Sequence, residues 1–310
     1  MMERKDFIKL TALAGGMYAA SGLARGGKMP VSFSSKDITA DDIQQFLVSL
    51  TRLGPKTVDR FIIGNPNTRI RKIGTCWMPY LETCKNAIES GVNLLVVHEP
   101  TFYTHWDLDE TQEDYYRSPD YTKKQYLELV EEKKKWILEN GLVIIRNHDT
   151  IDALKDRGIP FALGQFLGYG NDCIIASRTY YNVYKIDKQP ASQVAAALAE
   201  KLKELGQPGV AFYGNPDFPA SSIGIGTGCI CDPMYFADLQ PDIFIAIDDV
   251  VRTWTQTAFA IDSGRPLIII NHGTSEEMGM RMLNQIIQER FPEIETIHFK
   301  QGCTYKWITG

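Results

Sequence analysis

Three stretches of the chain share one pattern of hydrophobic and polar positions. They are residues 87–98 (AIESGVNLLVVH), 137–148 (ILENGLVIIRNH) and 260–272 (AIDSGRPLIIINH). Each starts with an apolar pair and an acidic residue, passes a glycine, continues with a run of Val, Ile and Leu, and ends in histidine. The glycines stand where a helix ends in a left-handed residue, at Gly91, Gly141 and Gly264. The pattern predicts a helix, a glycine stop and a buried strand, three times over.

The predicted strands are apolar at successive positions rather than at alternating ones. Continuous apolar runs are typical of strands that are covered on both faces, as in the parallel sheets of α/β proteins. The runs of this kind are Leu94–Val97, Leu142–Ile145 and Leu267–Ile270, with Ile223–Ile225, Ile243–Ile247 and Thr296–Phe299 as further candidate strands. Helical spacing of apolar residues predicts helices over 123–140 and 278–291. The chain is therefore predicted to be an α/β protein with mainly parallel sheets covered by helices.

A histidine follows each of the three repeated strands. His98, His148 and His272 each come just past a predicted carboxyl end, which is the edge where open α/β sheets bind their ligands. One histidine at a strand end is more often structural than functional. Three of the chain's five histidines in the same register indicate a shared site.

Carboxylates accompany the three histidines. Glu99 follows the first histidine directly, Asp152 lies four residues after the second, and Glu276 lies four residues after the third. Oxygen and imidazole donors without a thiolate suit iron, manganese, zinc or magnesium. Glu277 has the capping-box spacing from Thr274, so we expect Glu277 to cap the helix and Glu276 to be the ligand.

Asp149, next to His148, has two interpretations. It either accepts a hydrogen bond from the second ring nitrogen of a site histidine, or it serves the turn beside Asn147.

Three histidines and three carboxylates exceed what one catalytic zinc ion takes from protein. They suit two divalent ions about 4 Å apart that are bridged by carboxylate and solvent. Two such ions against Glu99, Asp152 and Glu276 leave one formal positive charge, which a bridging hydroxide would neutralise. That hydroxide would be a nucleophile at neutral pH.

Composition and charge exclude other classes of protein. The 310 residues carry 38 acidic and 33 basic side chains, a net charge of −5, whereas sequence-independent nucleic-acid binders show a basic excess. No apolar stretch reaches the 18 or more residues of an ordinary membrane span, which excludes a multi-span membrane protein. The six cysteines form no CxxC pair, so the usual structural zinc spacing is missing. Cys76, Cys84 and Cys173 are predicted to be small buried apolar residues.

Residues 1–30 have the character of an export signal. A charged start at 3–9 (ERKDFIK) is followed by a mildly apolar stretch, Leu10–Leu23, with small residues near Ala20 and Ala24. The start resembles a twin-arginine signal in which Lys5 replaces the second arginine. The sequence thus predicts an exported, periplasmic protein; the alternative is a frayed amphipathic helix at the N-terminus.

Four segments together resemble the NIF-three-like proteins, a family also labelled GTP cyclohydrolase I type 2-like. The segments are 93–102 (NLLVVHEPTF), 148–152 (HDTID), 242–253 (DIFIAIDDVVRT) and 271–276 (NHGTSE). Their order and spacing hold from Ile38 to the C-terminus, so residues 31–310 are expected to form one NIF-three-like α/β unit of two lobes.

The resemblance implies a dinuclear metal centre and a ring-shaped homohexamer. Matched by motif, the metal ligands are His98, Glu99, Asp152, His272 and Glu276, and His148 is the catalytic residue that lines the site. Glu99 stands where the family usually has a second histidine, which makes the site harder and more anionic and favours iron or manganese over zinc. Asp248 and Asp249 occupy a family motif without its glycine, and no role is assigned to them.

The stretch 103–121 has the character of an aromatic insertion beside the first histidine motif, either a lid over the site or an ordinary surface loop. The favoured function is a metal-dependent hydrolase that acts on a phosphoester or a cyclic amide, as a cyclohydrolase does. The alternative is a non-catalytic protein that binds, stores or senses metal on an oligomeric scaffold.

Overall fold

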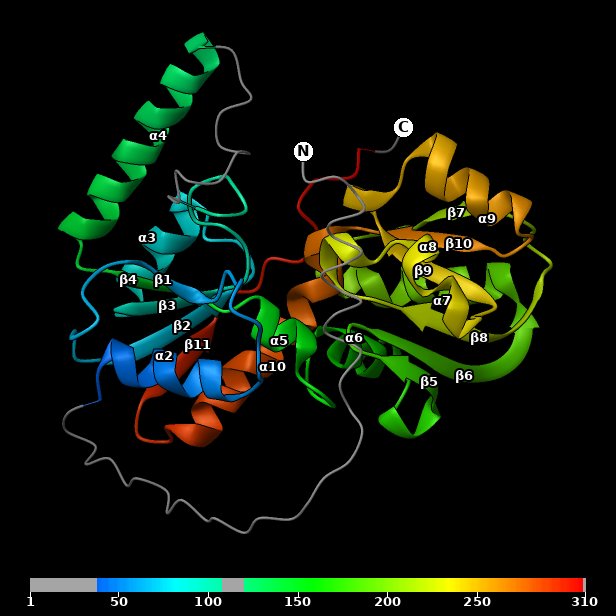
Figure 1. The fold of residues 1–310 in the computed structure, drawn as a ribbon, viewed down its shortest axis with the longest axis horizontal. Coiled ribbons are helices and arrows are strands. Elements are labelled where there is room, and N and C mark those ends of the chain that lie inside the picture. The colour runs from blue at the N-terminus through cyan, green and yellow to red at the C-terminus, as the bar shows by residue number, and fades with distance from the viewer. Residues whose placement is uncertain (1–37, 108–119, 309–310) are drawn as a thin grey trace.

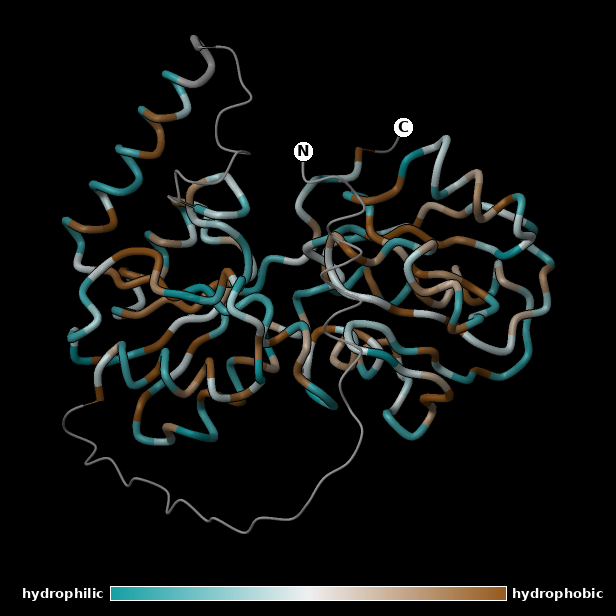
Figure 2. The backbone as a smooth tube through the Cα atoms, in the orientation of Figure 1, coloured by the Kyte–Doolittle hydropathy of each residue, from teal (hydrophilic) through white to brown (hydrophobic). Residues whose placement is uncertain are grey.

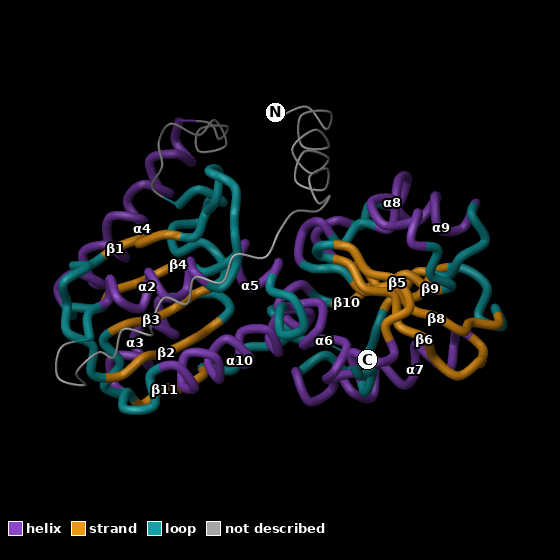
Figure 3. Tube along the Cα trace, turned by 60° about the horizontal axis from the view of Figure 1, so that its bottom comes forward, coloured by secondary structure: helices purple, strands orange, loops and turns teal. Residues whose placement is uncertain are grey.

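The computed structural model describes residues 38–107 and 120–308 (Figure 1). The predicted export signal at 1–30 and most of the aromatic insertion lie outside the described residues. Two lobes stand side by side, and each is built on its own β-sheet (Figures 1 and 3). The predicted two-lobed α/β architecture is confirmed.

The first lobe holds a five-stranded sheet of order β1-β4-β3-β2-β11, parallel except for β1. Its strands are β1 (Arg60–Ile63), β2 (Lys72–Cys76), β3 (Leu94–Val97), β4 (Val143–Arg146) and β11 (Glu295–His298). Its helices are α2 (Ala40–Ser49), α3 (Leu81–Glu89), α4 (Asp120–Glu139), α5 (Asp149–Ala153) and α10 (His272–Arg290).

Alternate residues of the central strand β3 enter two different cores. Leu94 and Val96 pack with α2 and α10 on one face of the sheet, while Leu95 and Val97 pack with α3 and α4 on the other (Figure 1). All four are buried, so the continuous apolar run follows from helices on both faces. Figure 2 shows such hydrophobic strands inside both lobes.

The second lobe holds a six-stranded sheet of order β5-β6-β8-β9-β10-β7. Strands β8, β9 and β10 run parallel in its centre, and the other pairings are antiparallel. Its strands are β5 (Ile174–Arg178), β6 (Tyr181–Pro190), β7 (Ala211–Tyr213), β8 (Pro219–Ile225), β9 (Ile243–Ile247) and β10 (Leu267–Ile270). Its α-helices are α7 (Ala191–Leu202), α8 (Pro233–Phe236) and α9 (Ala258–Asp262).

Short helical turns η2 to η7 complete the second lobe. They are η2 (Asn171–Cys173), η3 (Lys203–Leu205), η4 (Gly228–Ile230), η5 (Ala237–Leu239), η6 (Asp248–Val250) and the π-helix η7 (Thr253–Thr257). Helix α6 (Ile159–Leu167) joins the lobes, because Ile159 enters the core of the first and Leu163 enters the core of the second.

The predicted local structure agrees closely with the observed elements. Gly91, Gly141 and Gly264 have φ values of 80°, 64° and 70°, the left-handed conformation expected at the helix ends. Cys76 and Cys84 are buried as predicted, Cys173 is only partly buried, and all six cysteines are free. No helix within 38–107 and 120–308 combines the length and hydropathy needed to cross a membrane.

Candidate metal centre

The side chains predicted for the site come from both lobes. They follow β3 (His98, Glu99), follow β4 (His148, Asp152) and begin α10 after β10 (His272, Glu276). The carboxyl ends of β3 and β4 face that of β10 where the lobes meet (Figures 1 and 3). The strand ends predicted to share one site thus belong to two sheets, and the structure brings all six side chains together there.

Glu276 occupies the centre of the cluster. Its Oε2 atom lies 3.1 Å from Nε2 of His98 and 3.0 Å from Nε2 of His272. Nε2 of His98 is 3.7 Å from Oδ1 of Asp152, and Nε2 of His272 is 3.3 Å from Oε1 of Glu99. Two donor sets share Glu276: one contains His98 and Asp152, and the other contains His272 and Glu99. A further set joins His98 and Glu99 to His148. A carboxylate shared between two donor sets is the arrangement needed by a pair of neighbouring metal ions.

Several polar atoms of the cluster are buried without a hydrogen-bond partner. Among the residues described, these include Nε2 of His98, Nε2 of His272 and Oε1 of Glu276. The side chains of His98 and Glu276 are fully buried. Buried polar atoms in proteins are normally paired, because leaving them unpaired is costly. A cation among these atoms would satisfy all of them, so the donor set fits a metal centre.

The electrostatics of the cluster also favour bound cations. Burial alone would lower the pKa of His98, but the carboxylates of Glu276 and Asp152 raise it to about 9. Burial opposes the ionisation of Glu276 as well, yet His272 and His98 hold its pKa well below its usual value. Burial raises the pKa of Asp152 to about 6. Without a metal ion, the cluster therefore binds protons in its place.

Hydrogen bonds from surrounding residues fix the orientation of three candidate ligands, Glu276, Asp152 and His272. The indole N–H of Trp77 donates to Oε2 of Glu276 over 2.7 Å, and the hydroxyl of Thr227 donates to Oδ1 of Asp152 over 2.8 Å. Nδ1 of His272 lies 2.7 Å from Oδ2 of Asp249. Such partners orient metal ligands, and the carboxylate of Asp249 also raises the basicity of His272.

Two further aspartates hold the backbone at the strand ends. The carboxylate of Asp59 accepts the N–H groups of His148, Asp149 and Thr150 at 2.8, 2.8 and 2.9 Å, which caps helix α5. The carboxylate of Asp248 accepts the N–H of His272 at 3.0 Å.

No sequence pattern marks Trp77, Thr227 or Asp59 as site residues, and none gives a role to Asp248 or Asp249. The signal present for the last pair was their position directly after strand β9, at the same edge as the histidines.

The predicted start of α10 was wrong. The helix begins at His272 rather than Met278, because the side chain of Asn271 caps it by accepting the N–H of Thr274. His272 and Glu276 thus stand one turn apart on the same helix face. Glu277 is not the cap. Its carboxylate instead binds the ring of His298 at 2.8 Å and the N–H groups of Gln301 and Gly302.

Gly228 lets the backbone of η4 approach the cluster. Its φ is 41°, and a Cβ atom there would lie 2.7 Å from Oε1 of Glu276 and 3.3 Å from Nε2 of His272. Only glycine fits this position without displacing Glu276.

His148 lies at the solvent side of the cluster. Its ring stacks on that of His98 at a centroid distance of 4.4 Å and an interplanar angle of 14°. Its Nδ1 atom lies 2.9 Å from Oδ1 of Asp149, so Asp149 adopts the histidine-orienting role that the sequence had left open. The ring of His105 meets His148 edge-on at 5.8 Å. The described start of the aromatic insertion therefore borders the site.

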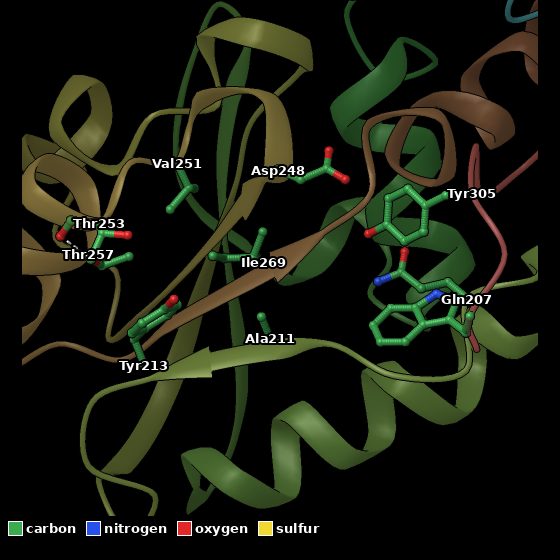
Figure 4. A pocket seen from close by; sticks show the side chains of 10 residues that line it. Gln207, Ala211, Tyr213, Asp248, Val251, Thr253, Thr257, Ile269 and Tyr305 are labelled. Carbon is green, nitrogen blue, oxygen red and sulfur yellow. Dashed lines mark hydrogen bonds between the residues drawn. The ribbon is translucent and has the colours of Figure 1, made fainter. Parts of the chain in front are cut away.

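A cavity of about 260 Å³ is lined in part by Asp248, the residue that accepts the N–H of His272 (Figure 4). Asp248 and Tyr305 stand at one end, Thr253 and Thr257 at the other, with Ile269 between them. Among the described residues, its lining includes the aromatic rings of Tyr213, Tyr305 and Trp307 and no basic side chain.

The fold has solved counterparts. Staphylococcus aureus hypothetical protein SA1388 aligns with a TM-score of 0.69 and 17% identity, covering 87% of this chain and 99% of that one. A Bacillus cereus protein related to NIF3 gives 0.68 and 14%, covering 89% and 100%. Reduced HcgD from Methanocaldococcus jannaschii gives 0.59 and 16%, covering 84% and 97%. Identities this low show a shared fold alone.

A search of curated proteins found no match. The family model described as Duf34/NIF3 (NGG1p interacting factor 3) matches residues 61–302, a range that contains every side chain of the cluster. This match confirms the resemblance stated for the sequence, and the chain belongs to the Duf34/NIF3 family.

Proposed function

We propose that the protein is a metal-dependent hydrolase with a dinuclear metal centre. Its metal ligands are His98, Glu99, Asp152, His272 and Glu276, and its substrate is a phosphoester or a cyclic amide. The observation that carries the proposal is the pair of donor sets sharing one buried glutamate, with imidazole nitrogens that have no hydrogen-bond partner.

The charge of the donor set supports two divalent ions. Three carboxylates against four positive charges leave one formal positive charge, which suits an anionic substrate group or hydroxide. Glu99 adds an oxygen donor where a histidine is usual in the family, so iron or manganese is favoured and zinc is the softer alternative. Divalent ions at such a site supply Lewis acidity toward phosphoryl or carbonyl oxygens and lower the pKa of water.

His148 is the proposed general acid and base. Asp149 accepts a hydrogen bond from Nδ1, which leaves Nε2 to take or give the proton. The ring of His148 is held in place because it stacks on the ring of His98. The side chain of His148 is 18% exposed, so solvent can reach it. His148 can therefore transfer a proton at a position next to the buried ligands.

Elemental analysis of protein purified without chelator tests the metal centre. We expect about two metal ions per chain and loss of both in Glu276→Gln. Glu277→Gln is the matched control, because this neighbouring buried glutamate binds His298 and the backbone instead of the cluster. Equal metal content in the wild type and Glu276→Gln would refute the proposed ligand set.

Turnover then decides between hydrolysis and the alternative of metal storage or sensing. Burial of His98 and Glu276 is the observation that favours the alternative, since it limits access to the donors. We expect the metal-loaded protein to hydrolyse bis(4-nitrophenyl) phosphate or a dihydropyrimidine ring, with His148→Gln lowering kcat at unchanged metal content. Full metal loading without turnover of either substrate class would favour storage or sensing.

Export through residues 1–30 and assembly into a homohexamer remain part of the proposal. Detection of the mature chain in a periplasmic fraction, and its mass in solution by light scattering, test these two points separately.

A further inference from the structure

Another group of donor atoms lies on the outer side of His272. Nδ1 of His272 is 2.7 Å from Oδ2 of Asp249 and 4.0 Å from Sγ of Cys229. These atoms lie within 4.8 Å of one another and could hold a metal ion. Nδ1 faces away from Glu276, which the opposite nitrogen of the same ring contacts.

The group is accessible from solvent, in contrast to the inner cluster. Cys229 is exposed, and the side chain of Asp249 is 57% exposed. His272 is 7% exposed on its side chain and separates these two residues from the buried donors. An ion arriving from this side of His272 therefore meets Cys229 and Asp249 before it meets Glu276.

Three separate elements place the donors together. Cys229 lies in η4, Asp249 in η6 and His272 at the start of α10. Gly228, next to Cys229 in the same turn, lies close to Glu276 and has a φ of 41°, so this position requires a glycine. The turn that positions the thiol of Cys229 is therefore the same turn, η4, that borders Glu276.

We propose that Cys229, Asp249 and Nδ1 of His272 form an outer metal site for a borderline or soft divalent ion such as Zn²⁺ or Co²⁺. Thiolate, imidazole and carboxylate are the donors that these ions take in tetrahedral sites, with water at the open position. The inner donors are imidazole and carboxylate alone, so the two sites differ in the softness of their ligands.

The separations fit such a site after a small side-chain movement. Tetrahedral coordination at ordinary zinc–ligand distances places donor atoms about 3.5 Å apart. The thiol is about half an ångström too far from Nδ1, and the carboxylate is somewhat too close because it accepts a hydrogen bond there. Both side chains are exposed and free to adjust. A bound outer ion replaces the proton on Nδ1, so it competes with the hydrogen bond to Asp249.

The outer site serves as the point of first capture for ions that load the buried centre. His272 belongs to both sites, through Nδ1 to the outer site and through Nε2 to the inner one. Only the imidazole ring of His272 therefore separates a captured ion from the side of Glu276. The outer site exists whether or not the inner centre is catalytic.

Cobalt titration of the chelator-treated full chain tests the outer site. A thiolate bound to Co²⁺ gives a charge-transfer band in the near ultraviolet, which imidazole and carboxylate ligands do not give. We expect the band in the wild type, its loss in Cys229→Ser, and its retention in the control Cys303→Ser, which changes a partly buried cysteine elsewhere. Absence of the band in the wild type, or its persistence in Cys229→Ser, would overturn the proposal.

Glu276→Gln separates this test from that of the hydrolase. The variant disables the inner donor sets but leaves Cys229, Asp249 and Nδ1 of His272 in place, so we expect the band to persist. A band lost only in Glu276→Gln would show that the thiol acts through the inner centre, and the separate outer site would be wrong.

Discussion

The indole N–H of Trp77 donates a 2.7 Å hydrogen bond to the carboxylate oxygen of Glu276 that faces both buried histidines. The carbonyl of Trp77 also accepts the N–H groups of His98 and Glu99. One residue at the end of β2 therefore orients the central carboxylate and the backbone of two further donors.

Replacement of Trp77 by phenylalanine should weaken metal binding while the chain stays folded. The backbone contacts remain, but Glu276 loses the donor that fixes its orientation. We expect metal affinity to fall about 10- to 100-fold, as is usual when such a partner is removed. Competition with a fluorescent chelator measures this, with Trp136→Phe as the control for loss of an indole away from the cluster. Equal affinities for both variants would contradict the role of the hydrogen bond.

Alanine substitution at Gly228 should remove metal binding by displacement of a ligand. The new Cβ would lie 2.7 Å from Oε1 of Glu276. Gly264→Ala is the matched control, because Gly264 is also left-handed, at φ 70°, but has no atom within 4 Å of its Cβ position. Both variants should lose about 1–2 kcal/mol of unfolding free energy to backbone strain. Only Gly228→Ala should lose metal in elemental analysis.

Arg146 should be a determinant of stability. Its side chain is fully buried and lies 3.6 Å from Glu99 and 3.5 Å from Asp107, while its Nε–H donates to the carbonyl of His98. Arg146→Met leaves two buried carboxylates without their counter-charge, so we expect a loss of about 3–5 kcal/mol in urea unfolding. Arg157→Met, which breaks a solvent-accessible pair with Glu289, should change stability by about 1 kcal/mol or less. Similar losses of unfolding free energy in both variants would show that burial does not determine how much Arg146 contributes to stability.

Metal binding should release protons and strengthen as the pH rises toward 9. The pKa of His98 is raised to about 9 in the metal-free protein, and a histidine must lose its proton to bind a metal ion. Calorimetric titrations in buffers of different ionisation enthalpy measure the protons released. Affinity that is constant between pH 6.5 and 9 would contradict this coupling.

The metal-free protein should show the opposite pH dependence of stability. A histidine with a raised folded-state pKa stabilises the fold fully below its ordinary value of 6.5, and this contribution is lost as the pH rises through about 9. Asp152, whose pKa is about 6, has already ionised in this interval. Thermal unfolding at several pH values, with and without metal, should therefore give slopes of opposite sign.

The features predictable from the sequence are those encoded locally. The runs at 94–97 and 267–270 matched strands residue for residue, because burial on both faces leaves a continuous apolar signature. The convergence of His98, Glu99, Asp152, His272 and Glu276 was predictable because each follows a strand end or lies one helical turn beyond it.

The missed features depend on contacts between distant segments. Trp77 reaches Glu276 across 199 positions of sequence, and Asp59 caps a helix about 90 residues away. No local pattern marks such residues as site components. The helix start at His272 was missed because Asn271 is as good a cap as Thr274, and the capping-box spacing to Glu277 favoured Thr274. Glu277 instead contacts His298, a residue that local spacing does not bring near it.

The route of the chain through the two lobes has a consequence for the order of assembly. The second lobe is one uninterrupted segment between α6 and β10, whereas α10 and β11 return to complete the first lobe (Figure 1). During synthesis, the second lobe can fold as it emerges, but the first remains without its edge strand and one covering helix. His98 and Asp152 are therefore made long before Glu276 arrives to join them. The inner donor cluster is complete only after translation has passed α10, so a metal ion could be bound by the whole set only from that point on.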